Sequence, residues 1–444
     1  MIRITTAHLG ATMAGAVRQD TTHQEPHKLP VKTLVSASIG NAVEWFDWTV
    51  YATFVVFFAG QFFPSENEAL ALIGATSTYA LAFFFRPLGG LVLGRFADLK
   101  GRKAGMLLTI LLMAGGSMVI AILPTYDQVG WFAPILLLLA RIAQGMSLGG
   151  EVSNASAYLG EIAPPAHRGR YSAFFYISTG SALLAASLLG VLLTTVLSDD
   201  QLESYGWRIA FFIGGLLGFI GMWLRRSLVE TEQFEENAEK ARATKNPLLQ
   251  TIKHHPKAVV QLMAFTLLST LSYYTFFSAL TPFAISFRDA DKTDVFIALS
   301  IGTALFVALC YPFGKLSDHI GRKPQLLIWS GAMAVLIVPL SFLVQDNLLS
   351  LIVVFCVGLG LYAMMASIAP AVMSELFPTE LRATGIGAWY NLTVALFGGT
   401  APLVITALSD AGHPLWFFWY VAIAAAVAFA VILTLRETKG TELR

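Results

Sequence analysis

Charged residues are scarce in this sequence. Asp, Glu, Lys and Arg make up 13% of its 444 residues, whereas a soluble domain usually has about 25%. The net charge of +1 provides no field that would attract a nucleic acid, so we expect no such partner. The 2 cysteines, Cys310 and Cys356, both lie in apolar runs. We expect them to be core residues, which argues against a disulfide framework or a cysteine-bound metal.

The sequence also lacks the motifs of enzymes. No metal-ligand spacing, nucleotide-binding loop or nucleophile motif is present. Glycine spacings such as Gly145 to Gly149 indicate close helix packing rather than a phosphate-binding loop. None of the 8 histidines falls inside a long apolar run, so a histidine proton relay is not expected. We therefore predict that the chain is not an enzyme and that it needs no metal and no cofactor.

Long apolar runs dominate what is present. Hydrophobic residues make up 56% of the sequence, and the mean hydropathy is +0.65. Many of the runs exceed the roughly 20 residues that span the hydrocarbon of a bilayer. They predict an all-α membrane protein with twelve transmembrane helices, at residues 32–60, 69–96, 104–123, 131–162, 170–197, 207–224, 258–287, 295–316, 325–344, 348–374, 383–408 and 415–435.

The distribution of basic residues predicts the orientation of these spans. With both ends of the chain on one side, 24 of the 29 Lys and Arg residues fall on that side and 3 on the other. Because cytoplasmic loops are the ones rich in Lys and Arg, we expect both termini to be cytoplasmic, in a multi-pass protein of the cell (inner or plasma) membrane. Residues 1–31 then form a cytoplasmic tail, and the first span acts as an uncleaved signal anchor.

A duplicated pattern divides the chain into two halves. The pattern G-x-x-x-D-x-x-G-R-K starts at Gly94 and again at Gly314, an offset of 220 residues. A second pattern, Glu followed by Pro three and Arg seven positions later, starts at Glu161 and at Glu375. Two matches at corresponding places predict two homologous six-helix bundles, 32–224 and 258–435, related by a pseudo-twofold axis. Residues 225–257 form a central cytoplasmic loop, as an amphipathic helix or a flexible linker, and 436–444 form a short cytoplasmic tail.

The duplicated loop resembles the signature of the major facilitator superfamily, whose two six-helix bundles hold a substrate between them at mid-depth in the membrane. Further motifs resemble those of the metabolite:proton symporters, and among these the α-ketoglutarate permeases: Gly40-Asn-Ala-Val-Glu44-Trp45-Phe46-Asp47-Trp48, Arg86-Pro87-Leu-Gly-Gly90, Arg141-Ile-Ala-Gln144-Gly145 and Leu228-Val-Glu230-Thr231. The resemblance implies that the partners are a small-molecule substrate, protons and the lipid bilayer, and we expect a monomer. It also implies a gating role at the inner mouth for the charged residues of the repeated patterns: Asp98, Arg102, Asp318, Arg322, Glu161, Arg168, Glu375 and Arg382.

Ionisable residues also lie at membrane depth, all of them in the N-terminal half: Glu44, Asp47, Arg86, Arg141 and Glu151. Such charges are costly in hydrocarbon and mark functional sites. Because Glu44 and Asp47 are three residues apart, they share one face of the first helix. At least one of them should therefore be protonated or paired with an arginine. One interpretation is a structural ion network. The other is a site for protons and an anion, whose net charge of −1 becomes zero when one proton binds.

Each of these residues has an expected role under the second interpretation. Asp47 is the predicted main proton carrier, with Glu44 as its partner and Glu151 as a further candidate. Arg86 is the predicted primary contact for a substrate anion and Arg141 its nearest competitor, because a planar guanidinium binds a carboxylate through two hydrogen bonds. The C-terminal half offers uncharged polar groups, which either pack helices together or contact the substrate: Tyr273, Tyr274, Tyr390 and Asn391.

These features together predict a proton-coupled symporter that imports a small organic acid by alternating access, with α-ketoglutarate or a related di- or tricarboxylate as the substrate. Two alternatives stay open, a symporter for zwitterions such as proline or betaine and a drug/proton antiporter. The antiporter is disfavoured because no proline lies between Gly180 and Gly190 in the fifth span, where such antiporters carry a Gly-Pro pair. The fifth span also lacks the glutamines of α-ketoglutarate permeases, so the substrate is the least supported part of this prediction.

Overall fold

The structure of the protein is a computed structural model that describes residues 31–64, 68–244, 246–398 and 400–443. The predicted cytoplasmic tail, 1–31, lies outside the described residues except for Val31. Residues Lys32–Arg444 form one compact unit.

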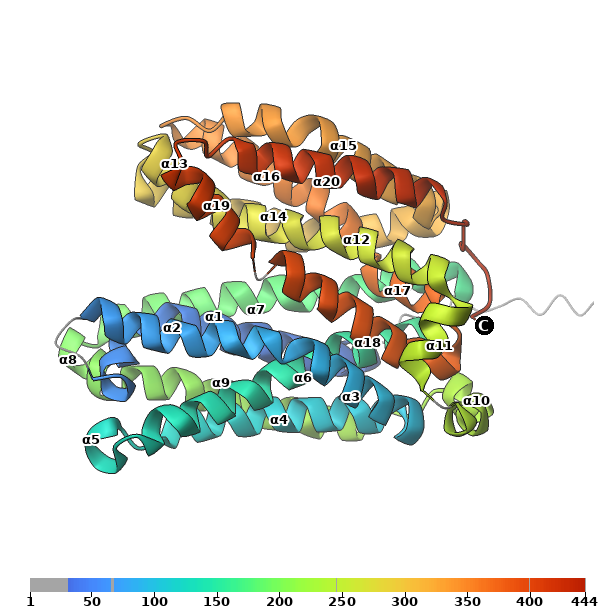
Figure 1. Cartoon of the computed structure of the whole chain (residues 1–444), viewed down its shortest axis with the longest axis horizontal. Helices are drawn as coiled ribbons and strands as arrows, with labels where there is room; N and C mark the ends of the chain where they lie inside the picture. Colours follow the sequence, from blue (N-terminus) through green and yellow to red (C-terminus); the bar gives the residue numbers. More distant parts are fainter. Residues whose placement is uncertain (1–30, 65–67, 245, 399, 444) are drawn as a thin grey trace, which may run out of the picture. The chain divides into compact units, whose positions relative to one another are not determined.

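Every regular element among the described residues is a helix (Figure 1). The first half contains α1 Val31–Phe62, α2 Glu68–Phe84, α3 Arg86–Lys100, α4 Arg102–Ile122, α5 Tyr126–Val129, α6 Phe132–Ile162, α7 Arg168–Val196, α8 Asp199–Gln201 and α9 Trp207–Arg226. The central segment contains α10 Glu232–Ala243 and α11 Pro247–His254. The second half contains α12 Pro256–Tyr274, α13 Leu280–Phe287, α14 Lys292–Ile320, α15 Arg322–Phe342, α16 Leu348–Ala366, α17 Ala369–Leu376, α18 Arg382–Thr393, α19 Ala401–Asp410 and α20 Trp416–Leu433.

The described helices account for the twelve predicted spans. Ten helices, some of them made of consecutive segments, are long and apolar enough to cross a membrane. α2 and α3 together form an eleventh span, bent by 41°. The remaining predicted span, 383–408, is covered by α18, a π-helical segment Val394–Gly398 and α19, apart from residue 399, which lies outside the described residues. The prediction of an all-α fold with twelve spans in two bundles is confirmed.

Besides the π-helical segment Val394–Gly398, two further breaks in helical geometry within the described spans position the site described below. The bend between α2 and α3 falls at Phe85, and Pro87 is the second residue of α3. Proline lacks a backbone N–H and its ring clashes with the carbonyl four residues earlier, so it is tolerated in the first turn of a helix but not in its interior, which explains why a new helix begins at Arg86. The seventh span has a π-helical segment, Thr275–Ala279, directly after Tyr274. Such segments widen a helix and are frequent at functional sites.

The repeated glycines of the duplicated loop end helices in the same way in both halves. Gly101 separates α3 from α4 with a φ of +108°, and Gly321 separates α14 from α15 with a φ of +101°. A side chain is strained in this backbone conformation, so glycine is the residue that allows the tight turn. The arginine after each glycine is the first residue of the next helix, where it is held close to the loop aspartate.

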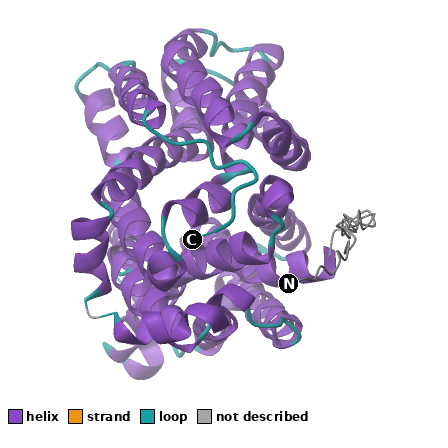
Figure 2. Cartoon of the chain, turned by 90° about the vertical axis from the view of Figure 1, so that its right-hand side faces the viewer, coloured by secondary structure: helices purple, strands orange, loops and turns teal. Residues whose placement is uncertain are grey.

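The helices of each half pack as a bundle of their own. In the first bundle α4 packs on α6 and α9, and in the second α14 packs on α16 and α15 packs on α20. Two pairs of helices make the main contacts between the bundles, α3 with α18 and α7 with α14 (Figure 1). Figure 2 shows the described chain from one end, with its helices in purple and its loops in teal. α3 and α14 hold corresponding places in the two halves, as do α7 and α18. The pseudo-twofold relation seen in the sequence is therefore also present in the packing.

The central segment is a structured part of this unit. α9 continues through Arg226, so Arg225, which the sequence analysis assigned to the loop, is a helical residue and is fully buried. α10 has acidic residues in its first turn and basic residues in its last turn, which is the charge order that stabilises a helix. Arg95 of α3 donates hydrogen bonds to the last carbonyl groups of this helix, those of Ala241 and Thr244, at 3.1 and 2.9 Å.

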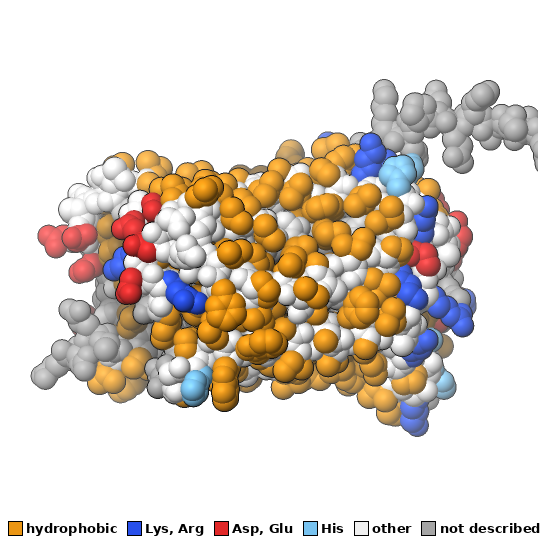
Figure 3. Space-filling view, turned by 90° about the horizontal axis from the view of Figure 1, so that it is seen from above, with side chains coloured by type: hydrophobic (Ala, Val, Ile, Leu, Met, Phe, Trp, Pro, Cys, Tyr) orange, Lys and Arg blue, Asp and Glu red, His pale blue; other side chains and the backbone are white. Residues whose placement is uncertain are grey.

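The surface has the charge distribution of a membrane-spanning protein. Figure 3 shows one face, on which Lys and Arg side chains gather at one end, Asp and Glu side chains gather at the other, and apolar side chains cover the length between. Exposed large apolar side chains are numerous along the helices, among them Val56, Ile122, Leu188, Val335 and Ile423. Exposure of these apolar side chains to water would be unfavourable, whereas contact with lipid tails keeps them away from water.

Candidate functional site

A small cavity lies between the two bundles. Its volume is about 30 Å³, far below the several hundred Å³ of a typical ligand pocket. In this conformation the cavity is therefore too small to hold a substrate. The lining residues come from both halves: Trp45, Arg86, Tyr176, Thr179, Ser269, Thr270, Tyr273, Tyr274, Tyr362, Tyr390 and Val394.

Arg86 is the one charged residue in the described lining of this cavity. Its side chain is 2% exposed, and its Nε atom has no hydrogen-bond partner among the described residues. The guanidinium lies 5.1 Å from the centre of the Phe83 ring and forms no ion pair within the described part of the chain. A buried charge without an opposite charge is costly, so this arginine is suited to receive an anion.

The rest of the lining is rich in aromatic residues. The ring of Tyr273 lies 5.1 Å from the ring of Trp45, which joins the two bundles, and 5.3 Å from the ring of Tyr274. The rings of Tyr176 and Tyr362, also from different bundles, are 6.2 Å apart. Sequence analysis selected Tyr273, Tyr274 and Tyr390 but missed Tyr176 and Tyr362. Tyrosines inside an apolar run were the signal that could have found them.

Arg141 does not line the cavity. It lies inside the first bundle, where its Nη1 atom forms a 2.9 Å ion pair with Asp47, and both side chains are fully buried. The guanidinium also stacks over the ring of Tyr51 at 3.8 Å, a favourable cation–π contact. The second carboxylate oxygen of Asp47 accepts a hydrogen bond from Ser117. Asp47 is thus fixed by an ion pair and a hydroxyl group.

Glu151 has a partner that the sequence analysis missed. Arg225 of α9 forms two hydrogen bonds with its carboxylate, and Thr109 donates a third at 2.6 Å. Arg225 also donates to the carbonyl groups of Ala37, at 2.7 Å, and of two other helix residues. Arg225 lies next to a cytoplasmic loop, where arginines usually face the cytoplasm. Nothing in the sequence shows that Arg225, rather than the adjacent Arg226, is the one buried in the bundle.

Among the described residues, Glu44 is the one membrane-depth carboxylate without an arginine partner. Its Oε1 atom lies 2.7 Å from the hydroxyl of Ser147, and its Oε2 atom has no partner among the described residues. With Arg225 included, and the residues of the repeated patterns left aside, the described part of the first bundle contains three buried carboxylates and three buried arginines. Two ion pairs form, and the charges left over are Glu44 in the bundle and Arg86 in the cavity wall.

Asn391 lies at a crossing between the bundles rather than in the cavity wall. Its amide donates to the carbonyl of Gly149 in α6 at 2.9 Å and to that of Gly387 in α18 at 2.7 Å. The role of a substrate contact stays a prediction for this residue, and the geometry shows a packing contact.

Charged residues from both repeated patterns form a buried ion cluster, which we call the first inter-bundle cluster: Asp98, Arg102, Glu161 and Arg382. Arg102 pairs with Asp98 and, at 3.1 Å, with Glu161 within the first bundle. Across the interface, Arg382 of α18 pairs with Glu161 at 2.6 Å. Asp98 also accepts a 2.9 Å hydrogen bond from the backbone N–H of Thr384. The cluster therefore joins the two bundles.

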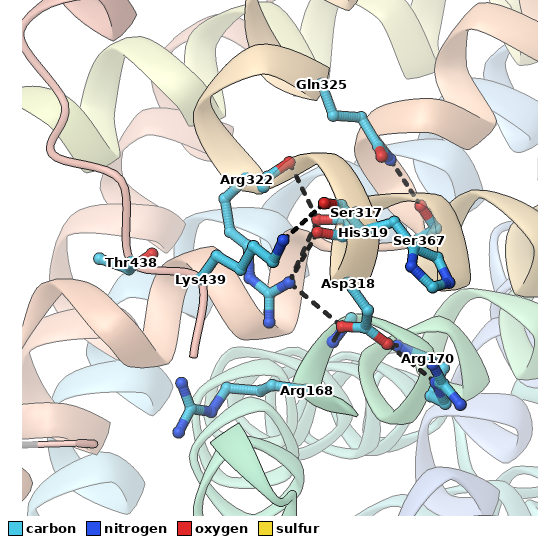
Figure 4. Close-up of polar contacts among 12 residues, drawn as sticks. Arg168, Arg170, Ser317, Asp318, His319, Arg322, Gln325, Ser367, Thr438 and Lys439 are labelled. Atoms are coloured by element: carbon cyan, nitrogen blue, oxygen red, sulfur yellow. Dashed lines mark hydrogen bonds and ion pairs between the residues drawn. The ribbon is translucent and has the colours of Figure 1, made fainter. Parts of the chain in front are cut away.

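The pseudo-symmetric residues form the second inter-bundle cluster: Asp318, Arg322, Glu375 and Arg168. Arg322 pairs with Asp318 at 3.1 Å and with Glu375 at 3.5 Å within the second bundle. Across the interface, Arg168 pairs with Glu375 at 2.7 Å. Asp318 lies between Arg170 and Arg322 (Figure 4) and accepts a 2.8 Å hydrogen bond from the backbone N–H of Gly169. The eight residues predicted to act together are thus brought together as two matching clusters.

Two further glutamates complete these clusters. Glu230 accepts hydrogen bonds from the backbone N–H of Arg102 at 2.9 Å and of Lys103 at 3.2 Å, at the start of α4. Glu437 accepts the corresponding hydrogen bonds at the start of α15, from the backbone N–H of Arg322 at 2.9 Å and of Lys323 at 3.0 Å. A carboxylate at this position stabilises a helix N-terminus. Each of the two glutamates is the third residue of a Leu-x-Glu-Thr pattern, and this third internal match was not used in the sequence analysis.

Two pseudo-symmetric bundles of membrane-spanning helices with a small cavity between them define a membrane transporter. The chain belongs to the Major Facilitator Superfamily, whose family model matches residues 37–399. It is 37% identical over 416 residues to an α-ketoglutarate permease of Escherichia coli (strain K12), which covers 92% of this chain and 95% of that protein. It is 32% identical over 431 residues to a glycine betaine/proline/ectoine/pipecolic acid transporter of Dickeya dadantii (strain 3937), covering 93% and 84%.

A solved structure shares the fold. The structure of a proton:xylose symporter bound to 6-bromo-6-deoxy-D-glucose aligns with a TM-score of 0.77 and 19% identity, over 93% of this chain and 97% of that one. The chain is therefore a multi-pass membrane transporter for a small molecule, and not an enzyme.

Proposed function

We propose that this transporter is a proton-coupled symporter that imports a small organic acid, α-ketoglutarate or a related di- or tricarboxylate, into the cytoplasm as a monomer. The observation that carries the proposal is Arg86, a buried guanidinium in the wall of the central cavity that has no ion partner among the residues that the structure describes. The 37% identity to an α-ketoglutarate permease supports the choice of substrate.

The cavity supplies the contacts that a carboxylate needs. A guanidinium can bind a carboxylate through two parallel hydrogen bonds, which are stronger than those between neutral groups. Tyr274 and Tyr390 line the same cavity as Arg86, and their hydroxyl groups can donate hydrogen bonds to further carboxylate oxygens. Substrate binding requires the cavity to enlarge, which a relative movement of the two bundles would provide.

Proton coupling follows from the balance of buried charges. The charges of Glu44, Asp47 and Glu151 are balanced by three arginines, Arg86, Arg141 and Arg225, so an added substrate anion leaves the site with excess negative charge. Uncompensated charge at membrane depth is costly, and one proton on a carboxyl group of α1 removes one unit of it. We assign that proton to Glu44 or Asp47, with Glu151 held by Arg225 and less accessible to it.

We further propose that the two inter-bundle clusters form the cytoplasmic gate, closed in this conformation. Both lie at the ends of helices next to the Lys- and Arg-rich loops, which the positive-inside rule places in the cytoplasm. The bonds from Arg382 to Glu161 and from Arg168 to Glu375 join opposite bundles. They must break for the cavity to open on this side, as alternating access requires.

A zwitterion such as glycine betaine is the second candidate substrate. The aromatic rings of Trp45, Tyr273 and Tyr362 gather close to Arg86 in one cavity, and such rings attract a quaternary ammonium group through cation–π contacts. Arg86 would then bind the single carboxylate. The 32% identity to a transporter of glycine betaine and proline supports this candidate.

Uptake into proteoliposomes that contain the purified full chain separates the two candidates. Radiolabelled α-ketoglutarate, citrate, glycine betaine and proline are each supplied outside at the same concentration. We expect α-ketoglutarate to enter fastest and unlabelled dicarboxylates to compete with it. Saturable uptake of glycine betaine without uptake of any organic acid would replace the first candidate by the second. Uptake of none of the four would refute both.

A further inference from the structure

The two carboxyl groups of α1 each touch one serine, and the two serines have different hydrogen-bond surroundings. The hydroxyl oxygen of Ser147 lies 2.7 Å from Oε1 of Glu44 and 2.7 Å from the backbone carbonyl oxygen of Thr109. Both separations fall at the usual distance of an O–H···O hydrogen bond. Each of them therefore needs a hydrogen between its two oxygens, because bare lone pairs at this distance repel.

Ser147 has one hydrogen to give, and a carbonyl oxygen has none. If Ser147 donates to Glu44, its oxygen faces the carbonyl of Thr109 without a hydrogen. If it donates to Thr109, the second hydrogen must come from a protonated carboxyl group of Glu44. Only the second arrangement satisfies both contacts. The geometry of Ser147 therefore places a proton on Glu44.

Asp47 has the opposite arrangement. Ser117 receives a hydrogen bond from the amide of Gln144 at 3.0 Å and is in close contact with Oδ1 of Asp47. Its other acceptor neighbour, the carbonyl of Met113, is 3.1 Å away, beyond the roughly 2.5–3.0 Å of O–H···O bonds. Ser117 is thus free to donate to Asp47. The other oxygen of Asp47 is paired with Arg141, which fits an ionised carboxylate.

We propose that Glu44, rather than Asp47, holds the proton in this gate-closed conformation, and that Ser147 is a positioning residue that stabilises its protonated form. Asp47 stays ionised against Arg141 and fixes α1 in the bundle. The inference rests on the proposed function only in taking this proton to be the one that is transported.

The charges that act on Glu44 explain how a proton and an anion become coupled. They come from three elements: Glu151 of α6, Arg225 of α9 and Arg86 of α3. Glu151 and Arg225 neutralise one another in an ion pair, which leaves Arg86 as the cation that favours an ionised Glu44. A substrate carboxylate on Arg86 removes that advantage, so Glu44 keeps its proton while substrate is bound. Departure of the substrate through the open gate frees Arg86 again, which weakens proton binding, and the proton then leaves Glu44 to water on the cytoplasmic side. By linkage, the proton favours substrate binding to the same extent.

Infrared difference spectroscopy of the purified full chain in lipid tests this assignment without any substrate. A step from acidic to alkaline pH should remove the C=O band of a buried carboxylic acid. The band should be lost in Glu44→Gln, whose amide can donate to Ser147 in place of the carboxyl group. Addition of α-ketoglutarate to the unmodified chain should make the band persist to higher pH.

Serine variants provide a matched comparison that does not depend on replacing a carboxyl group. Ser147→Ala should shift the frequency of the band, and Ser147→Thr, which keeps a hydroxyl, should restore it. Ser117→Ala is the control, because it removes the hydroxyl beside Asp47 and should leave the band in place. If Glu44→Gln does not fold, these three variants still decide the assignment.

The possible outcomes separate the proton site from the transport function. A band that survives in Glu44→Gln, or that moves with Ser117→Ala and not with Ser147→Ala, would overturn the assignment and transfer the proton to another carboxyl group. A band that belongs to Glu44 in a chain that transports none of the tested solutes would leave the proton site in place and refute the proposed symport.

Discussion

Replacing Glu161 by Gln should open the proposed cytoplasmic gate. Glu161 receives bonds from Arg102, Thr231 and Arg382, and of these partners only Arg382 belongs to the opposite bundle. The bonds within its own half persist when the bundles separate, so they do not bias the gate. The bond to Arg382 exists only while the gate is closed. A hydrogen bond to a charged group contributes about 1.5–3 kcal/mol, so its loss should shift the closed-to-open ratio by roughly 10- to 100-fold.

Distances between spin labels on the two bundles measure this shift. Cys310 and Cys356 are first replaced by Ala, and labels are placed at Lys100 and Ile320, which are exposed and occupy equivalent places in the duplicated loops. The unmodified gate should give mainly the short distance, and Glu161→Gln should add a population at a longer one. Glu375→Gln breaks the corresponding bond to Arg168 and should do the same. An unchanged distance distribution in both variants would show that these ion pairs do not control the gate.

Arg86→Lys keeps the positive charge but loses the planar guanidinium, which can bind a carboxylate through two hydrogen bonds. The KM for α-ketoglutarate should therefore rise roughly tenfold, the effect of losing about 1.4 kcal/mol from one charge-assisted hydrogen bond. Arg95→Lys on the same helix, outside the cavity, is the control, and equal KM values in the two variants would remove Arg86 from the site. Asp47→Asn leaves the buried Arg141 without its ion partner, which costs about 3–5 kcal/mol. The variant should give less folded protein and should lose both uptake and substrate exchange. Retained exchange without uphill uptake would indicate that Asp47 is a proton carrier instead. Tags after Gln250 and at the C-terminus should be cytoplasmic and a tag near Asp200 external, and ends that report on opposite faces would contradict the proposed topology.

Features that repeat in the sequence could be predicted with the most detail. The duplicated loop with Asp98 and Asp318 and the later pair of Glu161 and Glu375 indicated two related bundles, and the structure joins their aspartates, glutamates and pattern arginines in two matching clusters. The twelve spans followed from the length of apolar runs, because the thickness of the bilayer sets a minimum length for a helix that crosses it. A third repeat, at Glu230 and Glu437, was visible in the sequence as well.

The pairing of buried charges could not be predicted, because it depends on how far each helix is rotated about its own axis. Arg141 and Arg86 looked equivalent as anion contacts, yet one faces Asp47 inside the bundle and the other faces the cavity. Arg225 lies at the end of a span, where only packing against α1 and α6 shows that it is buried. The sequence identified the ionisable residues at membrane depth except Arg225, and the structure shows how they pair within the described part of the chain.

The central claim is that an anion on Arg86 and a proton on a carboxyl group of α1 cross the membrane together. The most direct test is uptake of α-ketoglutarate into proteoliposomes with a pH indicator inside, with the membrane potential held at zero and a gradient of one pH unit, acidic outside. The account predicts uphill accumulation, roughly tenfold for each proton carried, because one pH unit is worth about 1.36 kcal/mol. The interior should acidify as substrate enters, and Glu44→Gln should lose both effects while it still exchanges labelled for unlabelled substrate. Accumulation that is the same with and without the gradient, and that leaves the internal pH unchanged, would contradict the account.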